Sequence, residues 1–357
     1  MPFITRITLL FFGIFSFFIF SPWNALAQDG SLPDWQAGLR IVTSPLPISL
    51  VAEPGTTIST ELKVKNGGTE PETLKIDILK FNAYEDTGKP ALHDLEPTDE
   101  FAKWVTFSEP TFTVLPEEWK TVTATFTVPE EASFGYYYAF VFSRAEDQEA
   151  KPGETAVVGG TATLVLLEAR VPNALREITV TEFSTDKTVY EFLPVNFTVS
   201  LKNSGNVHVA PRGNIFLSQG NRKDVALLEL NPNKGSILPD STRIFETGWK
   251  DGFPVYEETI ENGQVVLDEL GHQTYHLTWD FKNASHLRFG KYTAKMLLVY
   301  DDGTRDIPIE GVVSFWVMPW RLIAGAVFIG IFFLIGMKST LSKIWKRLFS
   351  RSSETSV

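Results

Sequence analysis

From Leu39 onward the chain consists of short runs in which apolar and polar residues alternate, separated by Pro, Gly and Asn. Alternation with a period of two predicts half-buried β-strands, because successive side chains of a strand point to opposite faces of a sheet. Before residue 320 no helical period appears beyond one short turn over Thr98–Trp104. The predicted strands are Thr57–Lys65, Thr73–Phe81, Thr121–Val128, Tyr136–Phe142, Thr161–Ala169, Glu177–Phe183, Val195–Lys202, Asn214–Ser218, Val225–Leu230, Arg243–Trp249, Tyr275–Trp279, Tyr292–Tyr300 and Gly311–Val317.

The predicted strands form two sets, divided at Arg170–Ala174. Lys65–Gly68 ends a strand in the first set, and Phe134–Tyr136 opens a later one. Lys202–Gly205 and Phe289–Tyr292 take the same places in the second set. Asn followed by Gly is typical of a turn with positive φ. The pattern predicts an all-β fold of two tandem antiparallel β-sandwiches that arose by duplication, with chance recurrence of turn residues as the alternative.

The second set contains an insertion, Phe253–Asp268. Asn262 and Gly263 stand there between two strand-like runs, Val255–Ile260 and Val265–Asp268. Asn-Gly between such runs is the strongest short-range signal of a β-hairpin. We therefore expect a hairpin in this part of the second sandwich.

An uncharged apolar run, Leu322–Met337, follows the strands. As a helix it would cover roughly 24 Å, slightly less than a bilayer core, which takes about 20 residues. Trp320 and Arg321 at one end, and Thr340 at the other, can complete the length at the membrane interfaces. We predict a transmembrane helix over residues 320–340; a buried core helix is the alternative.

The residues after this run are mostly basic, and positive charge beside a span marks its cytoplasmic side. Residues 341–357 are therefore predicted to be a cytoplasmic tail. Apolar residues at helical spacing between the basic ones favour an amphipathic helix on the inner leaflet, with a signalling segment as the alternative. The basic residues are Lys338, Lys343, Lys346, Arg347 and Arg351, and the apolar ones are Leu341, Ile344, Trp345, Leu348 and Phe349.

The N-terminus supports the same orientation. Arg6 precedes an apolar run, Ile7–Phe20, and Ala25–Ala27 follows as an Ala-x-Ala site. This order predicts a cleaved secretory signal peptide over residues 1–27, with an uncleaved first span as the alternative. The two sandwich domains are then predicted over residues 28–172 and 173–317.

The net charge of −11 is unevenly distributed. Because the tail is basic, the predicted outer part is more acidic than the chain as a whole, and an acidic surface excludes a nucleic-acid partner. The basic tail instead suits the anionic headgroups of a membrane. The chain has no cysteine. An exported chain without disulfides is more typical of a bacterial surface protein than of a small eukaryotic extracellular domain.

No motif indicates catalysis, a cofactor or a metal. His272 and His276 could share a strand face with Asp280 nearby, which allows a surface metal site, but two exposed polar positions explain them equally simply. Adjacent acids such as Glu117-Glu118 suggest a glycosidase only if they face each other, whereas neighbours on a strand point to opposite faces. A zinc-binding His-Glu-x-x-His helix, a Gly-x-Ser-x-Gly elbow and a phosphate-binding loop are all missing from the sequence. We therefore expect no enzyme activity and no cofactor.

Aromatic residues are numerous, with 28 Phe, 9 Tyr and 9 Trp, and most of them are expected in the strand-rich cores. Three rings are candidates for contact with a partner. Tyr137 lies in a run of three tyrosines, of which at least one must face outward. Trp249 and Phe253 stand beside Gly, Pro or acidic positions in expected loops, where exposed rings can anchor a partner.

Several turn sequences carry a resemblance to a known family: Pro54-Gly55, Lys65–Gly68, Val128-Pro129, Phe134–Tyr136, Asn203, Leu238–Ser241 and Gly290–Thr293. With the order of the segments, they resemble the bacterial WxL-interacting-protein family of membrane-anchored surface proteins. The resemblance covers most of the outer part, through residues that mainly mark the fold. It implies two immunoglobulin-like domains, one C-terminal span, attachment at the cell wall and binding of surface proteins or peptidoglycan. The short tail and the Phe253–Asp268 insertion depart from the family, so no partner or contact residue is carried over.

We therefore expect a non-catalytic, single-pass cell-membrane protein whose N-terminal part is extracellular and whose C-terminus is cytoplasmic. Its tandem immunoglobulin-like domains would bind or position a cell-wall or surface-protein partner. The alternative is an accessory subunit whose span pairs with another membrane protein through small residues, Gly325, Gly330 and Gly336. An envelope-acting hydrolase is the third hypothesis.

Overall fold

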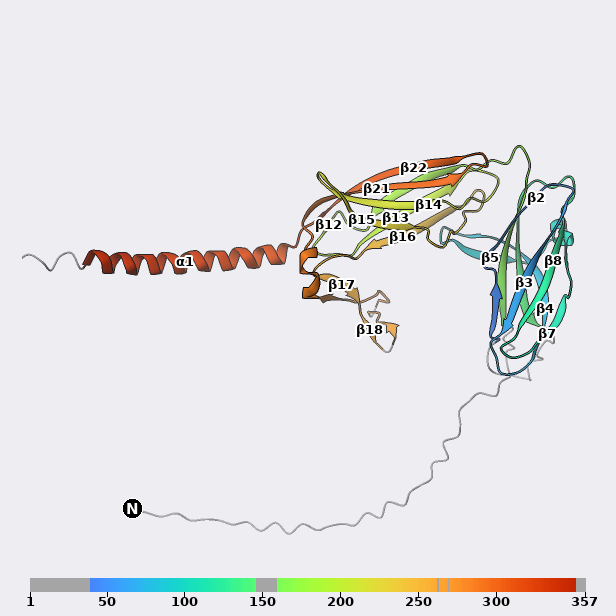
Figure 1. The fold of residues 1–357 in the computed structure, drawn as a ribbon, viewed down its shortest axis with the longest axis horizontal. Coiled ribbons are helices and arrows are strands. Elements are labelled where there is room, and N and C mark those ends of the chain that lie inside the picture. The colour runs from blue at the N-terminus through green and yellow to red at the C-terminus, as the bar shows by residue number, and fades with distance from the viewer. Residues whose placement is uncertain (1–38, 146–158, 262, 269, 351–357) are drawn as a thin grey trace, which may run out of the picture. The chain divides into compact units, whose positions relative to one another are not determined.

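The computed structural model describes residues 39–145, 159–261, 263–268 and 270–350 (Figure 1). From Arg40 onward these residues form one compact unit. Strands make up most of this unit, and one long helix follows them. The predicted all-β class, with tandem sandwiches and a C-terminal helix, is confirmed. The predicted signal peptide, residues 1–27, lies outside the described residues.

The strands of the first sandwich are β1 (Ile41–Ser44), β2 (Ile48–Ala52), β3 (Thr57–Asn66), β4 (Glu72–Tyr84), β5 (Lys89–His93), β6 (Val105–Phe107), β7 (Thr111–Val114), β8 (Trp119–Thr127), β9 (Phe134–Arg144) and β10 (Gly160–Ala169). One sheet has the order β1-β3-β8-β6, and the other has the order β2-β10-β9-β4-β5, with β7 also pairing with β4. A short 3-10 helix, η1 (Glu100–Trp104), forms within the turn predicted over Thr98–Trp104.

The strands of the second sandwich are β11 (Ile178–Thr185), β12 (Val189–Tyr190), β13 (Val195–Asn203), β14 (Arg212–Gln219), β15 (Arg222–Leu230), β16 (Thr242–Trp249), β21 (Gly290–Asp301) and β22 (Asp306–Val317). One sheet has the order β11-β13-β16, and the other has the order β12-β22-β21-β14-β15.

Both sandwiches begin in the same way. The first strand pairs antiparallel in one sheet, β1 with β3 and β11 with β13. The chain then crosses to the other sheet and pairs in parallel with its last long strand, β2 with β10 and β12 with β22. This shared order supports the predicted duplication of one sandwich.

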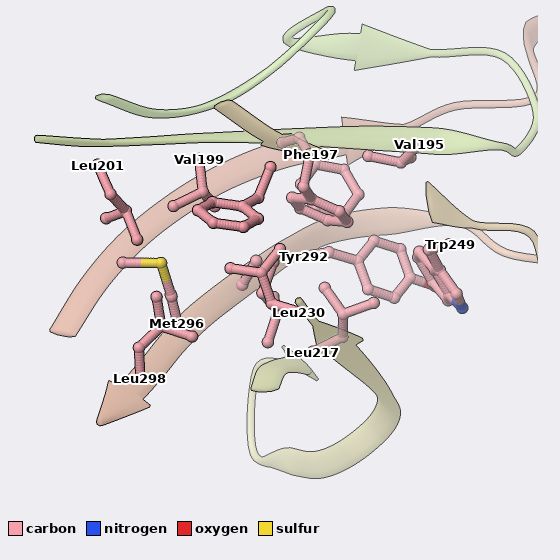
Figure 2. Packing of buried hydrophobic residues seen from close by; sticks show 14 of the residues in the cluster. Val195, Phe197, Val199, Leu201, Leu217, Leu230, Trp249, Tyr292, Met296 and Leu298 are labelled. Carbon is pink, nitrogen blue, oxygen red and sulfur yellow. The ribbon is translucent and has the colours of Figure 1, made fainter. Parts of the chain in front are cut away.

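Each sandwich buries the inward-facing side chains of both its sheets. In the second, alternate residues of β13 face alternate residues of β21 across the core (Figure 2). Trp249, the last residue of β16, packs against Tyr292 and Phe315, with ring centroids 5.1 and 6.3 Å away. Full burial of one large apolar side chain contributes about 1.5–3 kcal/mol to stability. Because the apolar residues of each strand alternate with polar ones, they all lie on one face, and burial of that face in the core stabilises the sandwich.

Asn66 closes a turn of the first sandwich with its side chain. Its Nδ2 donates hydrogen bonds to the carbonyl oxygens of Glu70 at 2.7 Å and Val114 at 3.1 Å. Its Oδ1 accepts a hydrogen bond from the backbone N–H of Gly68 at 2.8 Å. The Asn66 side chain is fully buried, so its amide group depends on these protein partners in place of water.

Asn203 repeats this arrangement in the second sandwich. Its Nδ2 donates to the carbonyl oxygens of Val207 at 2.8 Å and Ile237 at 3.0 Å, and its Oδ1 accepts from Gly205 N–H at 2.8 Å. The sequence predicted a positive φ at these two turns, and this prediction is wrong. Neither the two asparagines nor the glycines that follow them have a positive φ. Gly205 is required for space, because a Cβ there would lie 2.1 Å from the Leu175 carbonyl oxygen.

The insertion is longer than the sequence suggested. Its strands are β17 (Val255–Glu258), β18 (Ile260–Glu261), β19 (Gln264–Val265) and β20 (Tyr275–Thr278), and a 3-10 helix, η2 (Phe281–His286), leads the chain back to β21. β18 pairs with β19 around Gly263, whose φ is 78°, so a hairpin is present at the expected turn, but it is shorter than the two flanking runs predicted. β17 pairs with β20 outside it.

Two residues separate the end of β22 from the start of helix α1 (Trp320–Ser350). Its Trp320–Trp345 segment is long and apolar enough to cross a membrane, and none of the apolar window is buried in the rest of the chain. The helix continues past residue 340, where the span was predicted to end. The predicted span and the start of the predicted tail are therefore one continuous helix.

Candidate binding site

A pocket of about 470 Å³ is lined by residues from both sandwiches. From the first sandwich the lining is mainly apolar and includes Leu46, Pro47, Phe81, Ala83, Pro90, Leu92, Leu164 and Leu166. From the second sandwich it includes Asn233, Gly235, Ser236, Ile237, Leu238 and Arg243. Apolar walls with a few convergent polar groups are typical of ligand-binding pockets.

Arg243, on β16, is the most distinctive residue of the lining. Its guanidinium lies between two glycines, because a Cβ added to Gly88 or Gly235 would come within 2.3 or 2.6 Å of it. Its Nη1 donates a hydrogen bond to the Ser236 carbonyl oxygen at 2.9 Å. Burial lowers the pKa of Arg243, and no acid side chain contributes to the shift. An arginine nevertheless keeps its proton, so the pocket holds a half-buried cation without a carboxylate partner among the described residues.

Backbone contacts hold this arginine in place. The N–H of Ile244, the next residue, donates to the Asp86 carbonyl oxygen at 2.8 Å, which joins β16 to the β4–β5 turn. Asn231 fixes the loop before β16. Its Oδ1 accepts from Gly235 N–H at 2.7 Å, and its Nδ2 donates to the Pro211 carbonyl oxygen at 2.7 Å. The guanidinium is thus positioned by both sandwiches.

A small apolar cluster lies beside the pocket. Phe81, Ala139 and Leu166 of the first sandwich pack there against Leu238 of the second. This contact excludes water from one side of the pocket, and electrostatic attraction is stronger where water is excluded. The arrangement suits an anionic group, above all a carboxylate, that is attached to apolar side chains.

The three predicted contact residues lie in three different places. Tyr137 is half-buried beside the pocket, with ring centroids 5.9 Å from those of Phe81 and His208. Trp249 is 1% exposed and belongs to a strand, so its expected position in a loop is wrong. Phe253 lies at the start of the insertion, where its ring contacts neighbouring aromatic rings. A contact role for the three residues stays a prediction.

Arg243 was not identified from the sequence. It stands in an ordinary strand-like run, Arg243–Trp249, and nothing in that run distinguishes it from a solvated cation. Its environment arises from Gly88, which lies far away in the chain and leaves the room that the guanidinium fills. A single sequence gives no signal that a glycine and an arginine so far apart in the chain will lie next to each other.

The histidine site considered from the sequence does not assemble a metal centre. His272 Nδ1 lies 3.5 Å from Asp268 Oδ2, and His276 Nδ1 lies 3.4 Å from the Thr259 hydroxyl. Among the described residues, no group of three or more His, Asp or Glu side chains is arranged to hold a metal ion.

Comparison with known proteins gives one family match. Residues 48–153 match the family described as "Fn3-like domain", which covers less than half of the chain. No curated protein matches the sequence.

Solved structures of chaperones are similar to this chain at low sequence identity. The class 5 fimbriae chaperone CfaA is 13% identical, and the match covers 76% of this chain and 98% of that chain with a TM-score of 0.36. The Pseudomonas aeruginosa CupB2 chaperone is 9% identical, with 77% and 100% covered and a TM-score of 0.33. The comparisons thus show that residues 48–153, within the first sandwich and the segment after β9, match an Fn3-like domain.

Proposed function

We propose that the protein is a non-enzymatic, single-span bacterial surface protein that binds an envelope partner in the Arg243 pocket. The partner would present a carboxylate next to apolar side chains, as a peptide segment of a surface protein or of peptidoglycan does. The sandwiches would lie outside the cell and the C-terminus inside. The predicted likeness to the WxL-interacting proteins is in keeping with this location.

The half-buried, acid-free guanidinium carries this proposal. Removing a charge from water is costly, and an ion pair or charge-assisted hydrogen bond offsets the cost. Among the described residues, the Arg243 guanidinium donates to the Ser236 carbonyl oxygen and lies over the Phe245 ring, 5.2 Å from its centroid, and it forms no ion pair with an acid. A carboxylate entering the pocket would supply the missing partner, and a hydrogen bond to a charged group contributes about 1.5–3 kcal/mol.

Cross-linking on intact cells, followed by purification, first identifies the partner that the protein binds. The test is then how much of this partner the full-length protein in nanodiscs captures from envelope material. We expect Arg243→Gln to reduce the captured partner about tenfold, which corresponds to the loss of one charged hydrogen bond. Arg212→Ala is the matched control, because Arg212 is exposed and its ion pair with Asp306 at 2.8 Å lies on the surface. It is expected to leave capture unchanged.

Two results would count against the pocket. One is that the wild-type protein retains no envelope component. The other is that Arg243→Gln retains as much as the wild type while its unfolding temperature shows that it is folded.

The accessory-subunit hypothesis stays a prediction. It requires that replacing Gly325, Gly330 and Gly336 by Leu releases a co-purifying membrane protein.

A further inference from the structure

The chain leaves the second sandwich for α1 at one defined end. The last residue of β22, Val317, pairs with Gly290, the first residue of β21. Met318 and Pro319 alone connect β22 to α1, and Met318 N–H donates to the Tyr190 carbonyl oxygen at 2.7 Å. Two residues span about 7 Å at most. Whatever direction α1 takes, this end of the sandwich stays close to the start of the helix.

Exposed apolar side chains gather at the same end. Phe281 is 73% exposed, Phe289 is 54% exposed, and Trp279 and Leu287 are exposed as well. Phe253 packs on two of these rings, with centroids 5.7 Å from Trp279 and 5.4 Å from Phe281. We call these five residues the apolar cap. They come from the insertion, and η2 lies next to the point where β22 leads into α1 (Figure 1, orange).

Polar contacts hold the cap on the sandwich. Phe253 N–H donates to the His286 carbonyl oxygen at 3.0 Å. Asp251 binds His286 Nδ1 at 2.5 Å and Arg288 Nη2 at 2.6 Å. Arg288 lies over the buried ring of Trp249, 5.3 Å from its centroid. The cap is therefore attached to the core through half-buried Phe253, while the other four side chains stay exposed.

Cations flank the cap although the chain as a whole is acidic. Gln219 Nε2 donates to the Phe289 carbonyl oxygen, which places the β14–β15 turn beside the cap. Exposed Arg222 and Lys223 follow that turn, and exposed Lys291 follows Phe289 on β21. Exposed aromatic and aliphatic side chains next to basic ones are the composition of surfaces that lie in a membrane interface.

We propose that the apolar cap inserts into the interfacial layer of the membrane that α1 crosses and holds the second sandwich against the bilayer. This inference rests on the proposed span. The short connection to α1 identifies the bilayer as the occupant, because it brings this end of the sandwich to the membrane surface. Insertion of the rings removes apolar surface from water, and the flanking cations bind lipid phosphates; both contacts favour binding of the cap to the membrane. The sandwich would then be held at two places, by the helix and by the cap.

The absence of cysteine allows a direct test with the full-length chain. A single cysteine at Ser285, exposed in η2, carries an environment-sensitive fluorophore in vesicles that contain nitroxide-labelled lipid. Arg305→Cys reports on the opposite end of β22, roughly 35 Å away along the strand. Val327→Cys reports on the span. We expect lipid quenching at 285 to exceed that at 305 by about twofold or more, since interfacial residues lie within reach of the quencher.

A double variant links the signal to the rings. Phe281→Ser with Phe289→Ser is expected to lower the quenching at 285 to the level at 305. The matched control, Leu227→Ser with Val312→Ser, also removes two exposed apolar side chains, but outside the cap. It is expected to leave the quenching at 285 unchanged.

The outcomes separate the cap from the span. If 285 is quenched no more than 305 while 327 is quenched, the cap does not meet the bilayer, and the proposed span stands. If 327 is not quenched, the span fails and the cap proposal falls with it. If emission at 285 depends on the amount of protein per vesicle and not on the nitroxide lipid, the cap meets a second copy, and the bilayer proposal is overturned.

Discussion

Asn66 and Asn203 each bind three backbone groups with one fully buried side chain. Replacing either asparagine with Ala leaves carbonyl oxygens and an N–H without partners. Each substitution is expected to cost about 1–3 kcal/mol, the penalty of an unsatisfied buried polar group. Urea unfolding of the full-length protein measures the loss. Asn221→Ala, at an exposed turn, is the control and should be neutral; equal losses for all three variants would contradict the assigned role.

His208 gives a prediction about pH. Burial lowers its pKa, while Glu168 raises it and Arg176 lowers it further. The unfolded chain therefore takes up a proton at His208 at higher pH than the folded chain does. The contribution of His208 to stability is full above the ordinary histidine pKa of about 6.5 and is lost as pH falls below it.

The measurement is the unfolding temperature between about pH 7.5 and pH 5, a range that brackets the ordinary histidine pKa. We expect the decrease on acidification to be smaller in His208→Gln than in the wild type. His276→Gln, at an exposed position, should keep the wild-type decrease. A His208→Gln variant with the wild-type decrease would show that burial of this imidazole is not linked to folding.

At the scale of single residues, the sequence predicted some positions and missed others for physical reasons. The asparagine turns were identified, but their φ values were not, because side-chain hydrogen bonds and not the backbone set the turn. The end of β16 at Trp249 was predicted correctly, but the ring was expected to be exposed because Gly248 stands beside it, and the structure buries it. The exposure of a residue at the end of a strand depends on what the fold packs against it, which neighbouring residue types do not indicate.

Among the elements, β14 depends on a close approach of backbones. Gly213 pairs with Leu230 on one side and Leu298 on the other. A Cβ at Gly213 would lie 2.2 Å from the Leu297 carbonyl oxygen. Gly213→Ala must therefore move β14 away from β21, and strain of this kind costs about 1–3 kcal/mol.

Thermal or urea unfolding of the full-length chain tests this prediction. Asn214→Ala, one residue along the same strand and half-buried, is the matched control and should change stability by less than about 0.5 kcal/mol. If Gly213→Ala were as stable as the control, β14 and β21 would tolerate a wider separation than their pairing indicates.

Long alternating strands such as β3 and β10 were predicted nearly to their ends, because each has many inward-facing apolar residues. The short strands β1, β2 and β12 were missed. They contain only a few residues each, and their pairing with distant strands, parallel for β2 and β12, defines them. The start of the insertion and its Asn-Gly hairpin were predicted, but its extent up to η2 was not, since β20 reads as an ordinary strand of the sandwich.

At the scale of the whole molecule, three features combine. The sandwiches are joined by an apolar cluster and share a pocket with a half-buried cation. Only two residues separate the second sandwich from α1. An apolar cap lies at that same end. The apolar segment of α1 was recognisable from the sequence because it is local, whereas the pocket and the cap need residues that the fold brings together.

The most direct test of the account is the accessibility of single cysteines on intact cells that express the full-length chain. Arg305→Cys probes the turn between β21 and β22, and Ser353→Cys probes the C-terminal tail. A membrane-impermeant maleimide is expected to label residue 305 on intact cells and residue 353 only after lysis. Labelling of 353 on intact cells while 305 stays protected would contradict the proposed orientation and, with it, a binding role outside the cell.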